Sequence, residues 1–564
     1  MIAYFVMELG LEDNMPIYSG GLGTLAGDTL YSYADMDIPA VCVTLLYKRG
    51  YNLQKITPHG MQLDFDALWD YKKYLRKLDV EVEVLFGDKK QKVACWEYWV
   101  RSKADVRILF LDADVEGNDP EIRKLNSKLY FDDGIYRLRQ EILLGIGGYR
   151  VLKALGYPIH VYHMNESHSA FLVVELLREF KSSDEVRKRC VFTTHTPVPA
   201  GHDKFPVDMV KEELKAYDII DWEKEAVEGY INLSVLASRY SGKVNAVSQR
   251  HMYVTQGIFP ELTGSLEYVT NGVYHKRWIH PELQEVFNEY IPGWDENPIL
   301  LQRVYDIPSE LLLKTHNKIK SELINLINKQ TDASFSDDVF TVGIARRVTP
   351  YKRNDLILRD IDRLIHIGER VGEIQIVFAG KAHPKDGMGK DMIKRIFEAM
   401  RIIRERTKTV KVTFLENYGI DMAKLLIAGC DVWLNNPKRP YEACGTSGMK
   451  AGMNGVLNFS TWDGWWLEGG VEGVNGWGIG PRPSWQDMSE SLDEEDLEDL
   501  YGKLAHIILP TYYKHKDEWV RLMKNSIGGG ASRRRNYYTI SIDSQNRLFS
   551  HKYFHLHHPG KAFL

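Results

Sequence analysis

Short apolar runs alternate with longer amphipathic segments along most of this chain, and that alternation constrains the fold more than any other feature. Runs of strand length separated by helix-sized segments are typical of βα units, whose parallel strands form one sheet. Residues 80–86 and 93–100 depart from the pattern, because they alternate in polarity around Gly87 and Asp88 and predict a β-hairpin. In the first half of the chain we expect strands at residues 2–7, 40–46, 106–111, 159–164, 190–194, 243–247 and 268–270.

The alternation starts again after a polar, helix-prone stretch at residues 281–338. The strands expected there are residues 339–345, 374–379, 410–415, 431–434 and 456–459, with helices at 354–371 and 388–406. A chain of 564 residues is too long for one hydrophobic core. We therefore predict an α/β protein of two doubly wound, Rossmann-like domains, residues 1–280 and 281–530, facing each other across a cleft. Ligands of such sheets bind at the carboxyl ends of the strands, which makes the cleft the expected active site.

Composition and charge exclude several classes of protein. With 72 Lys and Arg against 77 Asp and Glu, the net charge of -5 provides no overall attraction for nucleic acid. No stretch approaches the roughly 18 consecutive apolar residues of a membrane span, and the first residues lack the regions of a secretory signal. The five cysteines form no C-x-x-C pattern and no H-E-x-x-H spacing occurs, so neither a disulfide framework nor a metal site is expected. We expect a cytoplasmic protein without nucleic-acid or membrane partners.

Two segments have the composition of anion-binding loops. Residues 19–27 (SGGLGTLAG) would suit a tight turn into a helix whose free N–H groups receive an anion, although an ordinary glycine-rich loop has the same composition. Residues 346–353 (RRVTPYKR) place four cations directly after an expected strand. Such a cluster predicts a phosphate pocket, and a solvated basic turn is the alternative.

The most specific segment is residues 442–455 (EACGTSGMKAGMNG). Its small residues expose backbone N–H groups and a hydroxyl ahead of an expected helix, which is the composition of a phosphate cradle. The spacing is not that of a P-loop. Lys450 follows just inside. A lysine is most often a solvated surface residue, but one held among glycines and apolar residues beside a phosphate could have a lowered pKa and form a Schiff base.

Two further segments, residues 163–168 (HMNESH) and 193–197 (TTHTP), each follow an expected strand of the first domain. Their asparagine and histidine side chains would open onto the cleft, because the carboxyl ends of parallel strands meet at one edge of the sheet. Groups of this kind hydrogen-bond sugar hydroxyls.

Residues 442–450 resemble the pyridoxal-phosphate segment of the α-glucan (glycogen/maltodextrin) phosphorylases, whose fold is the two-domain GT-B type. Residues 462–466 (WDGWW) look like the short microbial branch of that family. The resemblance covers most of the first 480 residues or so and runs in order through residues 4–8, 19–27, 162–168, 193–197, 244–247, 269–273, 346–353 and 442–450.

The resemblance implies pyridoxal 5′-phosphate as cofactor, with α-1,4-glucan and inorganic phosphate as partners in a reversible, retaining reaction that gives glucose 1-phosphate. The cofactor phosphate would be the acid–base partner of the substrate phosphate. The implied cofactor-binding residues are Lys450, which would carry the cofactor covalently, Gly445, Thr446, Ser447, Arg346 and Lys352. The implied substrate-binding residues are Gly20, Gly21, Leu22, Asn245, Glu442, His195, Asn165, Glu166 and His168. The implied catalytic group is Lys450, Arg347 for the substrate phosphate, Lys352 and His195.

Two other functions stay open. A nucleotide-sugar-dependent GT-B glucosyltransferase, such as a glycogen synthase, shares the fold, but such enzymes resemble one another in carrying a second glutamate where this chain has Lys450. The other is an inactive carbohydrate-binding homologue. The argument against it is that five residues are intact: Lys450, Thr446, Arg347, Lys352 and His195.

The end of the chain departs from the family pattern. After residue 532 the sequence becomes basic, His-rich and aromatic, so we expect an atypical tail at residues 531–564, consistent with a shifted reading frame or a truncated terminus. The chain starts close to its first strand, so the phosphorylation and nucleotide control of the animal enzymes are not expected. The resemblance also allows a homodimer. Glycogen, starch and maltodextrin remain alternative acceptors.

Overall fold

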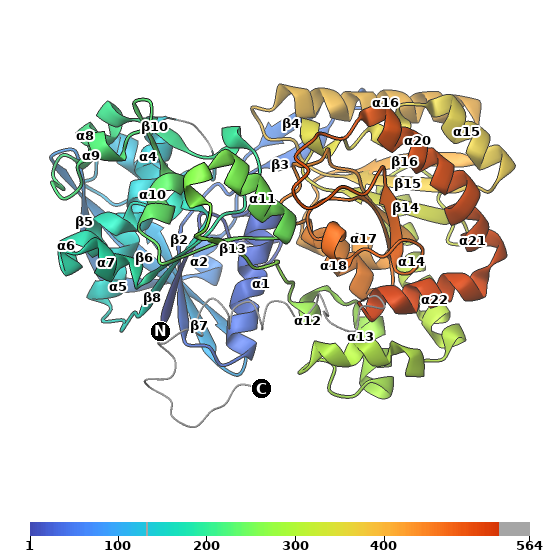
Figure 1. Ribbon diagram of the computed structural model, residues 1–564, viewed down its shortest axis with the longest axis horizontal. Helices are drawn as coiled ribbons and strands as arrows, with labels where there is room; N and C mark the ends of the chain where they lie inside the picture. Colours follow the sequence, from blue (N-terminus) through green and yellow to red (C-terminus); the bar gives the residue numbers. More distant parts are fainter. Residues whose placement is uncertain (131–133, 530–564) are drawn as a thin grey trace.

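The computed structural model describes residues 1–130 and 134–529 and contains one large sheet in each half of the chain (Figure 1). The first half, coloured blue to green, and the second half, yellow to red, lie side by side. The tail expected at residues 531–564 lies outside the described residues.

The sheet of the first half has nine strands in the order β13-β12-β9-β8-β1-β2-β7-β6-β5. Every pair from β13 to β7 is parallel, whereas β6 pairs antiparallel with both β7 and β5. The expected hairpin is therefore the edge of the main sheet and is longer than its polarity pattern indicated. The strands are β1 (Ile2–Phe5), β2 (Ala40–Leu45), β5 (Arg76–Phe86), β6 (Lys89–Arg101), β7 (Asp105–Asp112), β8 (Val161–Asn165), β9 (Cys190–Thr193), β12 (Lys243–Ala246) and β13 (Leu266–Tyr268).

The central strands of this sheet are buried on both faces. β1 and β2 are buried along their whole length, which is why their sequences read as continuous apolar runs. The helices of this half are α1 (Gly21–Asp35), α2 (Tyr71–Tyr74), α3 (Pro120–Arg123), α4 (Ile135–Ile142), α5 (Gly148–Ala154), α6 (Leu172–Phe180), α7 (Ser183–Arg187), α8 (Val207–Leu214), α9 (Trp222–Glu225), α10 (Leu233–Arg239) and α11 (Gln249–Ile258).

The sheet of the second half has six strands, all parallel, in the order β16-β15-β14-β17-β18-β19. Counted from β14 this is the order 3-2-1-4-5-6 of a Rossmann sheet. The sequence did not predict β19, which is short and half glycine. The strands are β14 (Phe340–Ala345), β15 (Ile374–Ala379), β16 (Val410–Leu415), β17 (Val432–Asn435), β18 (Leu457–Thr461) and β19 (Gly476–Ile479).

The helix expected at residues 354–371 is shorter than its pattern suggested, because α15 begins only at Ile361 and a 3-10 turn, Leu356–Leu358, precedes it. The helices after α11 are α12 (His275–Trp278), α13 (Pro281–Tyr290), α14 (Ser309–Gln330), α15 (Ile361–Arg370), α16 (Gly387–Arg406), α17 (Ile420–Gly429), α18 (Thr446–Met453), α19 (Trp466–Gly469), α20 (Asp493–Lys503), α21 (Leu509–Lys514) and α22 (Lys516–Ile527).

A small hairpin that the sequence did not predict, β3 (Leu53–Ile56) with β4 (Gln62–Phe65), connects the two halves. The amide Nε2 of Gln54 donates to the carbonyl oxygen of Gly380 (2.8 Å), and that of Gln62 to the carbonyl oxygen of Ala382 (2.9 Å). In Figure 1 the hairpin lies at the top of the boundary, beside α16. It fixes the first half against the segment that follows β15.

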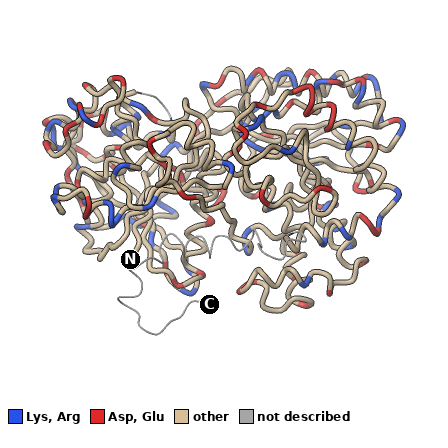
Figure 2. Tube along the Cα trace, in the orientation of Figure 1, with Lys and Arg blue, Asp and Glu red and all other residues tan. Residues whose placement is uncertain are grey.

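Charged residues of both signs are interspersed over both halves (Figure 2), as the near-balanced composition predicts. Within the described residues, no helix is both long enough and apolar enough to cross a membrane. The strand order reverses between β1 and β8 in the first sheet and between β14 and β17 in the second. Ligands of doubly wound sheets bind beside such reversals, at the carboxyl ends of the strands.

Candidate functional site

The carboxyl ends of β8, β9 and β12 line one cavity in the first half. Three of the predicted sugar-binding residues contribute to it: Asn165, His195 and Asn245. The other wall is α1, which contributes Asp28. The sequence reasoning that placed these side chains at strand ends therefore brings them together.

Hydrogen bonds fix the orientation of these side chains. The ring nitrogen Nε2 of His195 lies 2.7 Å from Asn165 Oδ1, and Thr193 Oγ1 donates to Asn245 Oδ1 (2.8 Å). Burial lowers the pKa of His195 to about 3, so the ring is neutral at pH 7. With Nε2 donating to the amide oxygen, Nδ1 is left as an acceptor, as suits a sugar hydroxyl.

Glu166 and His168 lie next to this cavity and are not among its described lining residues. The Glu166 carboxylate is committed to protein partners: Oε2 accepts from the backbone N–H of His195 (2.8 Å) and from Thr196 Oγ1 (2.9 Å). Burial raises its pKa to about 7. His168 faces Asp203, with 3.6 Å between Nε2 and Oδ2. Glu166 therefore supports the segment that bears His195, whereas His168 belongs to a separate contact with Asp203.

The glycine-rich loop leads into α1, with Gly20 as its N-cap. The Gly20 N–H donates to Glu8 Oε2 (3.3 Å), so this predicted phosphate donor already has a partner in the structure. Gly21 and Leu22 belong to the first turn, whose N–H groups lack intrahelical acceptors. A Cβ built on Gly21 meets no atom of the described residues within 4 Å, so residues 1–130 and 134–529 leave space beside these amides. The helix N-terminus is thus available to an anion.

Arg346 follows β14 and is the clearest anion-binding group of the second half. Its Nη2 donates to the carbonyl oxygen of Leu434 (2.9 Å) and to Asn436 Oδ1 (2.7 Å). Its Nε and Nη1 are buried and have no hydrogen-bond partner among the described residues. Burial lowers its pKa to about 10. A buried guanidinium with two unmet donors fits an anion such as the phosphate of a cofactor.

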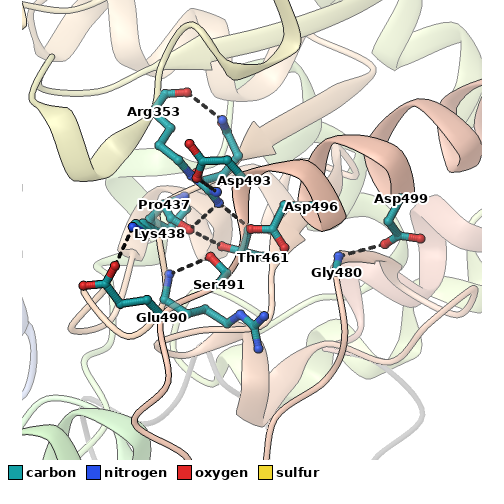
Figure 3. A network of polar contacts seen from close by, with 12 residues as sticks. Arg353, Pro437, Lys438, Thr461, Gly480, Glu490, Ser491, Asp493, Asp496 and Asp499 are labelled. Carbon is teal, nitrogen blue, oxygen red and sulfur yellow. Dashed lines mark hydrogen bonds and ion pairs between the residues drawn. The ribbon is translucent and has the colours of Figure 1, made fainter. Parts of the chain in front are cut away.

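Arg353 has a different role from the one that the cluster of four cations suggested. Figure 3 shows that it points into a network with α20, where Nη1 donates to Asp493 (2.8 Å) and Nη2 to Asp496 (2.7 Å). It also donates to the carbonyl oxygens of Asn436 (2.9 Å) and Pro437 (3.0 Å). This arginine therefore stabilises the basic loop, and its guanidinium forms ion pairs with two carboxylates.

The other cations of the loop remain beside the candidate site. Lys352 forms an ion pair with the Glu442 carboxylate, and both side chains are largely buried. Burial alone would lower the pKa of Lys352, but the negative charge of Glu442 raises it overall. Arg347 keeps an exposed side chain. The loop thus presents Arg346, Lys352 and Arg347 within eight residues.

The phosphate-cradle segment turns sharply into α18. Gly445, its N-cap, has φ 89°, a left-handed conformation that favours glycine. Thr446 and Ser447 then begin the helix, and Ser447 Oγ accepts from Trp433 Nε1 (3.1 Å). The N–H groups of Thr446 and Ser447 precede the first intrahelical acceptor, as in an anion-binding helix terminus, whereas that of Gly448 donates to the carbonyl oxygen of Gly445 (3.3 Å).

Lys450 lies on α18 and is 6% exposed, so the surface-lysine alternative is wrong. Its Nζ sits 3.6 Å from the ring centroid of Trp278, whose Nε1 donates to Asp28 Oδ2 (2.7 Å) on α1. Burial lowers the pKa of Lys450 to about 8, with Asp28 acting against the fall. Such an amine is partly unprotonated near neutral pH and fits a carbonyl cofactor bound covalently. Lys450 and Arg346 are the residues whose environments best fit pyridoxal phosphate.

Comparisons with known proteins agree with this geometry. A family model described as carbohydrate phosphorylase matches residues 211–469, and one described as starch synthase catalytic domain matches residues 15–267. The maltodextrin phosphorylase of Thermococcus litoralis is 37% identical, over 94% of this chain and 68% of that protein. The glycogen phosphorylase of Aquifex aeolicus is 36% identical, over 93% of this chain and 83% of that protein.

The chain belongs to the carbohydrate phosphorylase family.

This membership confirms the family resemblance, and the two facing sheets confirm the GT-B type of fold. The match to a starch synthase domain is expected, because GT-B phosphorylases and nucleotide-sugar transferases share this architecture. The domain boundaries and the roles of single residues stay predictions for this phosphorylase.

The candidate phosphorylase site includes residues that the sequence did not single out. Asn271 lines the same cavity as Asn165, and since it follows β13, the reasoning from strand ends would have found it. Asp28 and Trp278 are different. One lies inside a helix and the other on a short connecting helix, and nothing in their local sequence predicts that they meet Lys450.

One cluster of the phosphorylase has the residue types of a metal site. Ligand atoms of Glu141, His168 and Asp203 lie within 4.8 Å of one another. Arg137 is placed among them, with Nε 3.1 Å from Glu141 and Nη2 3.0 Å from Asp203. The guanidinium therefore already supplies the positive charge that these carboxylates need.

Proposed function

We propose that this protein is an α-glucan phosphorylase: it cleaves terminal α-1,4-glucosyl units with inorganic phosphate and releases glucose 1-phosphate. The observation that carries the proposal is Lys450, a buried lysine of lowered pKa at the position where nucleotide-sugar transferases have a second glutamate. The names of the two relatives described above support the same activity.

We infer that pyridoxal 5′-phosphate is the cofactor. Lys450 would bind it covalently, and the first turn of α18 with Thr446 and Ser447 would hold its phosphate. Arg346 would meet that phosphate with its two unpartnered donors. When bound, the cofactor supplies a phosphate group that exchanges a proton with the substrate phosphate.

The protein's own residues would bring the second phosphate and the sugar into place. Two phosphates side by side repel each other, so local cations are needed, and Arg347 and Lys352 provide them. Glu442, His195 and Asn245 would hydrogen-bond the glucosyl hydroxyls, because neutral imidazole, amide and carboxylate groups together match donors and acceptors of a sugar. The open space beside Gly21 would admit the substrate phosphate at the N-terminus of α1.

We propose further that the protein acts in the cytoplasm and forms a homodimer. The first statement follows from the composition and segments of the sequence, and the second from the family resemblance. Sedimentation of the purified protein over a range of concentrations tests the second, and a monomer at every concentration would refute it.

Two measurements test the function. The first is release of glucose 1-phosphate from glycogen and from maltoheptaose with inorganic phosphate, beside transfer of glucose from ADP-glucose or UDP-glucose. Activity only with the nucleotide sugars would refute the proposal.

The second is borohydride reduction after incubation with pyridoxal phosphate, followed by peptide mass spectrometry. A pyridoxyl adduct is expected on Lys450. Lys320 is the matched control, because it is also buried but is held by Asp431 (2.6 Å) and by the hydroxyl of Tyr512 (2.9 Å). Labelling of Lys320 and not of Lys450 would contradict the assignment.

A further inference from the structure

The first turn of α11 in the first half contacts the segment that leads into α18 in the second half. Ser248, the N-cap of α11, donates its hydroxyl to the carbonyl oxygen of Ala443 (2.6 Å). The backbone N–H of Gln249 donates to Glu468 Oε1 (2.9 Å), on α19. Figure 1 shows α11 at the boundary between the halves. Two consecutive residues of the first half therefore hold the second half next to Glu442.

Arg250 is the next residue, and it is 0% exposed. Its Nη1 donates to the carbonyl oxygens of Ser484 (3.0 Å) and Trp485 (2.7 Å), and its Nη2 to that of Asp487. Its Nε faces Asp463 Oδ1 at 3.8 Å. Neither of these two atoms has a hydrogen-bond partner within the described residues. A side chain of the first half is thus fully enclosed by the second.

Asp463 in turn holds the backbone of Glu442. Its Oδ2 accepts from the Glu442 N–H (2.8 Å). The turn that follows is packed against the same segment: Gly464 has φ 52°, and a Cβ there would lie 2.4 Å from the carbonyl oxygen of Cys444. Trp465 N–H donates to that oxygen (2.9 Å). The turn that contains Asp463 therefore packs closely against the segment that contains Glu442.

The positive charge of Arg250 stabilises the ionised carboxylate of Asp463. A buried carboxylate is costly unless a cation or hydrogen-bond donors compensate it. Burial raises the pKa of Asp463 to about 7, while the N–H of Glu442 and the charge of Arg250 oppose the rise. Removing the guanidinium would therefore weaken the carboxylate as an acceptor for Glu442.

We propose that Arg250 and Asp463 are positioning residues through which the first half sets the orientation of Glu442. The Glu442 side chain pairs with Lys352, so the same contacts act on both. The coupling stands on geometry alone, and only its consequence for catalysis rests on the proposed function. A displacement of about 1 Å in a positioning group can cost ~100-fold in rate. We expect a loss of at least ~10-fold here, since Glu442 would be loosened and not removed.

The test uses the full-length protein with pyridoxal phosphate and the variants Arg250→Met and Asp463→Asn. The matched control is Arg239→Met, which removes an arginine of the first half that pairs with Glu225 at the surface. Hydrogen exchange of the peptide spanning residues 440–447 reports the Glu442 N–H without reference to activity. Steady-state phosphorolysis of maltoheptaose then gives kcat and KM for each variant, alone and combined with Glu442→Gln.

We expect faster exchange at residues 440–447 in Arg250→Met and Asp463→Asn and wild-type exchange in Arg239→Met. We also expect kcat/KM to fall at least ~10-fold in the two variants and to fall little further when either is added to Glu442→Gln, because residues that act through one group are not additive.

Wild-type exchange at residues 440–447 would overturn the proposal, and so would additive losses with Glu442→Gln, which indicate a structural role alone. If Arg250→Met does not fold, Asp463→Asn, which keeps the side-chain volume, decides the matter. If the wild-type protein releases no glucose 1-phosphate, the proposed function fails, and the exchange comparison still accepts or rejects the coupling.

Discussion

Replacing Arg353 by methionine is the sharpest test of how the basic loop is held. Arg353 is 2% exposed, and Asp496, its partner at 2.7 Å, is 0% exposed. Removing one member of a buried ion pair leaves an uncompensated charge and costs about 3–5 kcal/mol. Asp493 adds little to this figure, because its side chain is 37% exposed and it also pairs with Arg359. We therefore expect Arg353→Met to lose about 4 kcal/mol of unfolding free energy.

Thermal unfolding followed by tryptophan fluorescence measures this loss. For a domain of this size, about 4 kcal/mol corresponds to a fall of roughly 8–16 °C in the unfolding midpoint. Arg363→Met is the matched control. It removes an arginine that pairs with Glu498 on the same helix, α20, but at the surface, where such pairs contribute about 0–1 kcal/mol.

A second substitution separates lost charge balance from lost packing. In the Arg353→Met background, Asp496→Asn removes the unpaired charge and should restore part of the midpoint. The reasoning is refuted if Arg353→Met and Arg363→Met have equal midpoints, or if Asp496→Asn lowers the midpoint of Arg353→Met further.

Four further predictions follow from the candidate site. In the folded apoprotein the pKa of Lys450 is about 8, against 10.5 for the free side chain, so between these pH values the unfolded state binds more protons than the folded state. The unfolding free energy should therefore rise by about 3 kcal/mol from pH 8 to 10.5. Lys450→Met should lack this rise. Gly21→Ala should raise the KM for phosphate several-fold and leave the midpoint of thermal unfolding unchanged, since its Cβ enters open space. Gly27→Ala should lower the unfolding midpoint, because its Cβ would lie 2.2 Å from the carbonyl oxygen of Gly10. His195→Ala should lower kcat/KM by about 10- to 100-fold, as expected for a lost polar contact of ~1–3 kcal/mol, and wild-type kinetics would contradict its assignment. All five cysteines are buried, so a thiol reagent should label none of them until the protein is denatured, which absorbance titration checks.

The strands that the sequence predicted best are those buried on both faces. Residues 374–379 and 410–415 match β15 and β16, because strands covered on both faces are mostly apolar: Gln375 in β15, and Lys411 and Thr413 in β16, are their only polar residues. The hairpin of β3 and β4 was missed for the opposite reason. Its two strands contain polar residues, among them the buried Gln54 and Gln62. These two side chains hydrogen-bond each other and backbone carbonyl oxygens of the other half, partners that the local sequence does not show.

The sequence by itself determined the two βα arrays, the family and the side chains that gather at strand ends, such as His195 and Asn245. These follow from local periodicity and from short segments whose backbone conformation is fixed within a few residues. Only the tertiary structure decided which charged side chains lie at the site and which form ion pairs away from it. It turned Arg353 toward α20 and placed Trp278 against Lys450. It also left two donors of Arg346 without a hydrogen-bond partner within residues 1–130 and 134–529. Partners that lie far apart in the chain determine each of these outcomes, because burial and pairing depend on what packs against a side chain and not on its neighbours in sequence.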